Sequence, residues 1–234
     1  MNDLLKYNRG KINIMKILIT GANGMLAYDV CRYLLSRNHT IIKTDVSQKE
    51  NDIKYLDVCK LNSVFECINK NVPEFIFHFA AETNVDLCEQ KPEHAYRVNT
   101  LGTENVVLAA AEHNIPLLYV STGGVFHGDS FEPYTEYDDP DPLNVYARSK
   151  YEGEKIVKDS LSRYFMLRAG WMIGGWELDK KFVFKIMEQL KNKKKEIFAV
   201  NDKLGSPTFT FDFANNILPV ISTKRYGLYH MANV

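Results

Sequence analysis

One short segment near the start of the chain constrains the fold most, because its pattern is that of a strand, a glycine turn and a helix in direct succession. The apolar run 16–19 is typical of a strand buried on both faces of a parallel sheet, and a helical pattern extends through position 35. Between them, Gly21 permits a tight turn, Gly24 lets backbone approach a pyrophosphate, and small Ala27 allows close packing. The segment predicts dinucleotide binding, and the alternative is a purely structural turn.

Strands and helices alternate over the first 150 residues. Further strands are expected at 40–44, 55–58, 75–81, 117–121 and 164–168, and helices at 61–71, 92–114 and 144 to about 163. This alternation predicts an α/β fold with a Rossmann-like, doubly wound parallel sheet. Ligands of such sheets bind at the carboxyl ends of the strands, so residues at these ends are the first candidates for a site.

The chain is expected to divide into three parts. Residues 1–14 form a polar leader, residues 15–168 a dinucleotide-binding Rossmann domain, and residues 169–234 a smaller, interleaved and apparently shortened substrate-binding lobe. The lobe is expected to contain helices at 182–190 and 212–221 and strands at 197–200 and 227–231.

Composition excludes several classes of partner. The 234 residues include 29 Lys and Arg against 29 Asp and Glu, which gives no electrostatic case for nucleic acid or an anionic membrane. No apolar run approaches the roughly 20 residues that a membrane-spanning helix needs. The four cysteines have no CxxC spacing, and no His/Cys/Asp cluster has the spacing of metal ligands. We therefore expect reduced thiols, no metal and a cytoplasmic location.

Asp45 lies at the end of the second expected strand, 24 residues after Gly21. A carboxylate there hydrogen-bonds an adenosine ribose diol and repels a 2′-phosphate, which favours NAD(H). NADP(H) stays open, because several side chains that suit a phosphate are close, namely Lys43, Ser47, Gln48 and Lys49. An ordinary turn residue is the alternative interpretation of Asp45.

Tyr146 and Lys150 are four residues apart in an expected helix, so they share one face. A phenol normally keeps its proton to about pH 10, and a nearby ammonium lowers that pKa. The pair therefore suits general acid–base catalysis, although such a pair also occurs by chance on solvated helices. Thr122 follows the fifth expected strand, and its hydroxyl is a candidate hydrogen-bond donor to a substrate oxygen.

Together these motifs resemble the extended short-chain dehydrogenase/reductase superfamily, and most of all the dTDP-4-dehydrorhamnose reductases and related 4-keto sugar-nucleotide reductases. The resemblance covers residue 16 to the end. Its motifs are the glycine turn, the pair at 57–58, the stretch 80–89, the turn 121–128, the loop 133–136, the pair at 146 and 150, and the turn 204–208.

The resemblance implies the roles of individual residues. Tyr146 acts as general acid, Lys150 binds the nicotinamide ribose, and Thr122 completes the catalytic set. The implied NAD(H) or NADP(H) contacts also include Gly21, Asn23, Gly24, Met25, Leu26, Asp45, Asp57, Val58, Ala80, Ala81, Thr83 and Asn99. The implied substrate contacts are Val85, Gly123, Trp171, Phe182 and Pro207.

The implied reaction is hydride transfer to the 4-keto group of a nucleotide-linked 6-deoxy sugar in dTDP-rhamnose or polysaccharide biosynthesis, and the resemblance also implies a homodimer. Two departures bear on the substrate: Gly123 replaces the usual Asp, and His127 replaces another. The alternatives are a sugar-nucleotide 4-epimerase and a non-catalytic NAD(P)-binding regulatory subunit. Gly123 and Gly124 argue against a dehydratase, which needs an acid–base pair at these positions.

Overall fold

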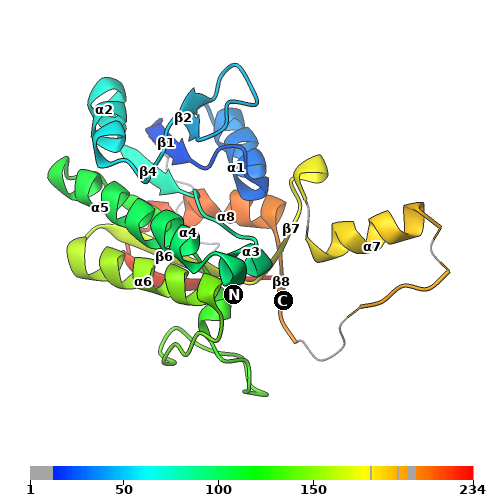
Figure 1. Ribbon diagram of the computed structural model, residues 1–234. Helices are drawn as coiled ribbons and strands as arrows, with labels where there is room; N and C mark the ends of the chain where they lie inside the picture. The colour runs from blue at the N-terminus through cyan, green and yellow to red at the C-terminus, as the bar shows by residue number, and fades with distance from the viewer. Residues whose placement is uncertain (1–12, 180, 194, 200–203, 234) are drawn as a thin grey trace.

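The structure is a computed structural model that describes residues 13–179, 181–193, 195–199 and 204–233. Most of the expected leader, residues 1–12, lies outside this range. Within the described ranges, one parallel sheet forms the centre of the molecule (Figure 1). Its strand order is β3-β2-β1-β4-β5-β6-β9. The bounds are β1 Lys16–Thr20, β2 Thr40–Asp45, β3 Lys54–Tyr55, β4 Phe75–His78, β5 Leu117–Thr122, β6 Tyr164–Ala169 and β9 Gly227–Met231.

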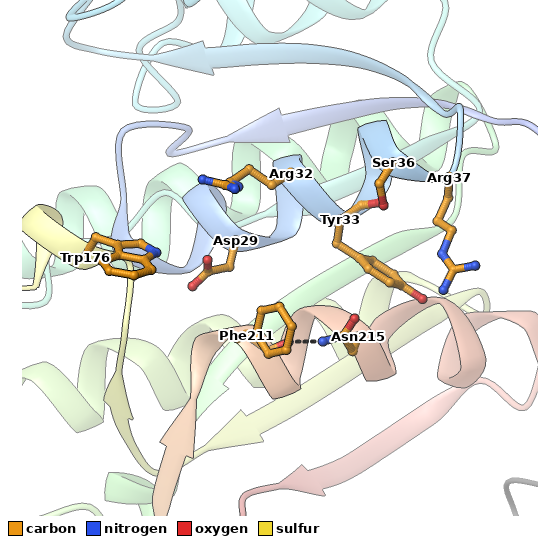
Figure 2. A pocket seen from close by; sticks show the side chains of 8 residues that line it. All are labelled: Asp29, Arg32, Tyr33, Ser36, Arg37, Trp176, Phe211 and Asn215. Carbon is orange, nitrogen blue, oxygen red and sulfur yellow. Dashed lines mark hydrogen bonds between the residues drawn. The ribbon is translucent and has the colours of Figure 1, made fainter.

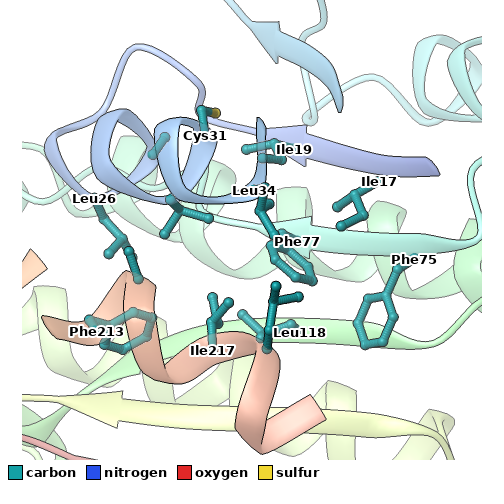
Figure 3. Packing of buried hydrophobic residues seen from close by; sticks show 14 of the residues in the cluster. Ile17, Ile19, Leu26, Cys31, Leu34, Phe75, Phe77, Leu118, Phe213 and Ile217 are labelled. Atoms are coloured by element: carbon teal, nitrogen blue, oxygen red, sulfur yellow. The ribbon is translucent and has the colours of Figure 1, made fainter. Parts of the chain in front are cut away.

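Helices cover both faces of this sheet, which explains why its central strands are continuous apolar runs. On one face, α1 and α8 pack over a cluster that includes Ile17, Phe77 and Leu118 (Figure 3). On the other face, α2, α5 and α6 pack over Leu18 and Ile76. The Rossmann-like, doubly wound architecture is thereby confirmed. The helix bounds are α1 Met25–Ser36, α2 Leu61–Asn71, α3 Val85–Gln90, α4 Pro92–Tyr96, α5 Gly102–Glu112, α6 Val145–Ser160, α7 Phe182–Lys191 and α8 Thr210–Ser222.

The last third of the chain is shared between the sheet and a smaller part. β9 pairs with β6, and α8 packs against α1, so both complete the main layers. A division of the chain at residue 169 therefore separates these two elements from the sheet that they belong to. A second, two-stranded sheet joins β7 Trp171–Ile173 to β8 Pro207–Phe209, and α7 extends away from the layers (Figure 1).

Several expected boundaries were wrong. The strand expected at 55–58 is observed only as Lys54–Tyr55, and the strand expected at 75–81 ends at His78. The helix α6, expected to end at about 163, ends at Ser160. The helix expected at 92–114 is interrupted by a π-helical turn, Arg97–Leu101. Residues 197–199 of the expected strand 197–200 are irregular, and Val200 lies outside the described residues. A short apolar run predicts that a strand occurs more reliably than it predicts where the strand ends. The end of a strand depends on hydrogen bonds to a neighbouring strand, which the run itself does not determine.

Across the described ranges, no helix is both long and apolar enough to cross a membrane.

Candidate active site

The glycine turn connects β1 to α1 and packs against the residues that follow β4, at the carboxyl edge of the sheet. Gly21 has a φ of +71°, and a Cβ atom there would lie 2.6 Å from the backbone nitrogen of Ala80. Glycine is therefore required by both conformation and space. Ala80 in turn donates its N–H to the Thr20 hydroxyl at 3.3 Å. The result is a cradle of backbone at the start of α1, which fits the diphosphate of a dinucleotide.

Asp45 closes the other side of this turn. Its two carboxylate oxygens accept the backbone N–H groups of Asn23 at 3.1 Å and of Ser47 at 2.9 Å. The carboxylate is thus held at the end of β2, where a ribose of a bound dinucleotide would lie. Lys43, a candidate for a 2′-phosphate, is paired instead with Asp52 at 2.7 Å and more distantly with Glu50.

The helix α6, which carries Tyr146 and Lys150, is fastened at its start by two side chains. The Asn144 side chain accepts the N–H of Ala147 at 2.8 Å, and a carboxylate oxygen of Glu89 accepts the N–H of Val145 at 2.7 Å. Capping of this kind satisfies free N–H groups, and a negative charge there complements the helix dipole. The capping role of Glu89 was not predicted, although Glu89 ends the stretch 80–89 on which the resemblance rests.

Tyr146 and Thr122 lie together, as the sequence predicts. Burial raises the pKa of the Tyr146 phenol to about 12, and a hydrogen bond with the Thr122 hydroxyl partly offsets this rise. The expectation of a lowered Tyr146 pKa is therefore wrong, because desolvation by burial dominates. The Thr122 oxygen also accepts the N–H of Gly124 at 3.0 Å, which leaves the hydroxyl proton for donation.

Lys150 is buried, with 3% of its surface exposed, and its ammonium lies 4.1 Å from the ring centroid of Tyr119. Burial lowers the pKa of Lys150 to about 7, and the charge of Glu154 opposes that shift. Glu154 is itself buried and bound to Arg168. This carboxylate was missed in the sequence, although Tyr146, Lys150 and Glu154 recur every four residues and so share one helical face.

Asn99 links the cofactor side to α6. It sits in the π-helical turn and is fully buried. Its side-chain oxygen accepts the N–H of Glu82 at 2.8 Å, and its side-chain nitrogen donates to the Ser149 hydroxyl at 2.9 Å. Ser149 donates to the carbonyl of Tyr146 at 2.8 Å. A supporting role for Asn99 agrees with this geometry, and π-helical turns are frequent at functional sites.

The remaining candidate cofactor contacts differ in how far their side chains are exposed. The side chains of Leu26 and Val58 are buried in the two cores, which leaves their main chain for a ligand. Asp57 accepts the N–H of Cys59 at 3.0 Å and so shapes the turn after β3. The other three are more open: Met25 begins α1, Ala81 follows Ala80, and Thr83 is exposed.

The candidate substrate contacts are brought together only in part. Trp171 and Pro207 are register partners in the β7–β8 sheet, and half of the Trp171 surface is exposed. Gly123 follows Thr122 directly, and a Cβ there would meet only ordinary contacts at 3.7 Å, so glycine is not required sterically. Val85 begins α3 with 41% of its surface exposed. Phe182 begins α7, away from the layers.

A surface hollow of about 430 Å³ lies between α1 and α8. Figure 2 shows its lining, which comes from α1, α8 and the turn at Trp176. There the buried Asp29 carboxylate accepts the Thr210 hydroxyl and, at 3.3 Å, the N–H of Gly175. These bonds tie α1 to the segment that follows β7. None of the candidate site residues lines this hollow.

Comparisons with known proteins assign the chain to a family. The model of the family "RmlD substrate binding domain" matches residues 15–234. The dTDP-4-dehydrorhamnose reductase of Aggregatibacter actinomycetemcomitans is 33% identical over 222 residues, which are 92% of this chain and 72% of that protein. The spore coat polysaccharide biosynthesis protein SpsK of Bacillus subtilis is 30% identical over 218 residues, or 93% and 73% of the two chains.

Solved structures with the same overall fold include a reductase crystallised with its cofactor. The dTDP-4-dehydrorhamnose reductase of Bacillus anthracis, crystallised in complex with NADP, superposes with a TM-score of 0.85 at 34% identity. The match covers 95% of this chain and 75% of that one. Since the family model spans residues 15–234, this protein belongs to the RmlD substrate binding domain family.

Proposed function

We propose that the chain is an NAD(P)H-dependent reductase of the dTDP-4-dehydrorhamnose reductase type, which reduces the 4-keto group of a nucleotide-linked 6-deoxy sugar. The observation that carries the proposal is the placement of Thr122, Tyr146 and Lys150 at the strand edge that also holds the glycine turn. Relatives at 30% identity and above that are named as this reductase support the same activity.

The dinucleotide supplies the hydride when it is bound. Tyr146 then donates its phenolic proton to the ketone oxygen as that oxygen gains charge, a role typically worth about 10²–10⁴ in rate. The Thr122 hydroxyl donates a second hydrogen bond to the same oxygen. Lys150 would hold the nicotinamide ribose of the bound cofactor.

NAD(H) is the better fit, because Asp45 is held at the ribose end of the turn and Lys43 is engaged by Asp52. The NADP complex of the Bacillus anthracis relative keeps NADP(H) as the second candidate for this chain.

We propose that residues 15–168 bind the cofactor and that residues 169–234 bind the sugar nucleotide mainly through the part around Trp171 and Pro207. This assignment is supported by the separate β7–β8 sheet, whereas α8 and β9 serve the main sheet. We also propose a homodimer, which light scattering would test, and a cytoplasmic location, which the four free cysteines support.

The experiment is direct. The purified chain is mixed with NADH or NADPH and with dTDP-4-dehydrorhamnose, and loss of nicotinamide absorbance is followed together with formation of the reduced sugar nucleotide. Net oxidation that depends on the sugar supports the reductase. Tightly bound NAD without net oxidation would favour the 4-epimerase, and cofactor binding without any sugar turnover would favour a regulatory subunit.

A further inference from the structure

A fully buried histidine in β4 joins the cofactor edge of the sheet to the helix that carries the catalytic pair. His78 is 1% exposed, and both of its ring nitrogens have hydroxyl partners. Nδ1 lies 2.7 Å from the Thr20 hydroxyl, and Nε2 lies 3.1 Å from the Thr103 hydroxyl. These two hydroxyls are equally buried and come from β1 and α5. His78 therefore connects β1, in the sheet, with α5, in the helical layer that covers it.

The direction of every hydrogen bond follows from the partners. The Thr103 hydroxyl donates its only proton to the carbonyl of Asn99 at 2.7 Å, so it accepts from His78 Nε2–H. A neutral imidazole then has a bare Nδ1, which accepts the proton of the Thr20 hydroxyl. The Thr20 oxygen accepts the N–H of Ala80. We call this series, from Ala80 through Thr20, His78 and Thr103 to Asn99, the His78 network.

A charged imidazole would break this order. With a proton on both nitrogens, His78 would present a donor to Thr20, whose oxygen already accepts from Ala80 and whose own proton would lose its acceptor. Burial, and secondly the charge of Lys150, lowers the pKa of His78 to about 3, which agrees with a neutral ring. The ring of Tyr119 stacks on His78 at 5.8 Å between centroids and covers it from β5.

The two ends of the His78 network are the two halves of the proposed active site. Thr20 and Ala80 directly precede Gly21 and Ala81, the residues of the dinucleotide cradle. At the other end, Asn99 binds Ser149, which donates to the carbonyl of Tyr146. A shift at His78 therefore has a hydrogen-bonded route to the backbone of the general acid.

We propose that His78 is a positioning residue for the reaction: as the neutral Nε2–H tautomer, it sets the spacing between the cofactor cradle and the helix that carries Tyr146 and Lys150. The inference rests on the proposed function for its kinetic consequence, while the tautomer and the coupling to α6 are properties of the protein alone. Displacements of the order of 1 Å between reacting groups cost about a hundredfold in rate, so spacing of this kind affects kcat strongly.

The test uses Thr103→Val, which removes the hydroxyl and nearly preserves shape, and Thr103→Ser, which keeps the hydroxyl. Phe77→Leu is the control, because Phe77 is as buried as Thr103 and precedes His78 in β4 but belongs to the core on the opposite face. For Thr103→Val we expect kcat to fall about ten- to a hundredfold while the Kd for the nicotinamide cofactor changes less than about threefold. Thr103→Ser should recover most of kcat, and Phe77→Leu should lower thermal stability alone.

Nitrogen-15 NMR of the histidine-labelled protein reports the tautomer directly, with a proton on Nε2 of His78 expected. A proton on Nδ1, or a kcat for Thr103→Val equal to that of Phe77→Leu, would overturn the proposal. If the wild-type protein does not reduce the sugar, the proposed function fails, and hydrogen exchange still decides this inference. Faster exchange of the α6 amides in Thr103→Val than in Phe77→Leu supports the coupling, and equal exchange contradicts it.

Discussion

The guanidinium of Arg168 in β6 is bound by both carboxylate oxygens of Glu154 in α6, with Nε to Oε1 at 3.0 Å and Nη2 to Oε2 at 2.6 Å. Both side chains are about 95% buried, and the Phe126 ring lies 5.0 Å from the guanidinium. Glu154 follows Lys150 by one helical turn. The ion pair therefore fastens the reactive face of α6 to the sheet.

Breaking this pair should destabilise the protein strongly, because the remaining charge stays buried without a partner. Glu154→Gln should lower the free energy of unfolding by about 3–5 kcal/mol. The control is Glu152→Gln, which removes an exposed pair with Lys155 on the same helix and should cost at most about 1 kcal/mol. Urea unfolding measures both changes, and equal losses would contradict a special role for the buried pair.

The charge on Lys150 should give the free protein a pH dependence near neutrality. Since its pKa is lowered to about 7, the ammonium is lost as pH rises through that value. Cofactor affinity should therefore weaken with rising pH. Titrations that give the Kd for NADH between about pH 6 and 9 measure this change. In Lys150→Met this dependence should disappear.

A variant of Glu154 tests the origin of this pH dependence, because the charge of Glu154 opposes the loss of the Lys150 proton. The neighbouring side chains of Tyr119, Tyr146 and His78 are uncharged near pH 7. In Glu154→Gln, the midpoint of the dependence should move to lower pH. A midpoint that stays in place, in a variant that remains folded, would mean that Glu154 does not set the charge of Lys150.

Tyr146→Phe should abolish reduction while the cofactor still binds, because the variant lacks only the phenolic hydroxyl that supplies the proton. The expected loss in kcat is about 10²–10⁴. Tyr151→Phe is the control: it removes a phenol from the next position after Lys150, where the ring lies beside Lys155. Turnover of Tyr146→Phe close to that of Tyr151→Phe would show that another group supplies the proton.

Asp45→Asn should change the choice of cofactor, because it removes a negative charge at the ribose end of the turn and keeps an acceptor for Asn23. We expect the ratio of Kd values to shift towards NADPH by about tenfold, which corresponds to about 1.4 kcal/mol. Lys43→Met should leave NADPH affinity nearly unchanged, because this ammonium is engaged by Asp52. Fluorescence titration with both cofactors tests the pair of variants.

His78 should make the fold sensitive to acid. Its pKa is about 3 in the folded protein, against about 6.5 in an unfolded chain. Between these values the unfolded state binds the extra proton, so the free energy of unfolding falls as pH decreases, by about 1.4 kcal/mol per pH unit from this group. His78→Gln should remove that slope. Chemical unfolding at several acidic pH values, compared between wild type and variant, measures the difference.

Local sequence was enough to predict the order of elements around the glycine turn. The apolar run 16–19, the glycines and the helical pattern to residue 35 correspond to β1 and α1 within a residue, because these signals are short-range. Tyr146 and Lys150 were predicted for the same reason, since helical spacing determines that they share a face. The length of the third strand was not predictable, because only pairing with β2 decides where it ends.

The long helix expected at 92–114 shows where local pattern is insufficient. Its periodicity is helical throughout, yet a π-helical turn at Arg97–Leu101 places Asn99 toward Ser149. That turn is stabilised by partners from other elements. The same is true of β9, whose sequence predicts a strand but whose place beside β6 depends on the returning path of α8.

By itself, the sequence determined the alternation of strands and helices, the glycine turn and the spacing of the Tyr146–Lys150 pair, because each depends on residues within a few positions of one another. Tertiary structure alone decided the ionisation of that pair. Burial raises the pKa of Tyr146 and lowers that of Lys150, and Glu154 opposes the second shift. Desolvation and charge are properties of the packed surroundings, which bring together groups far apart in the chain.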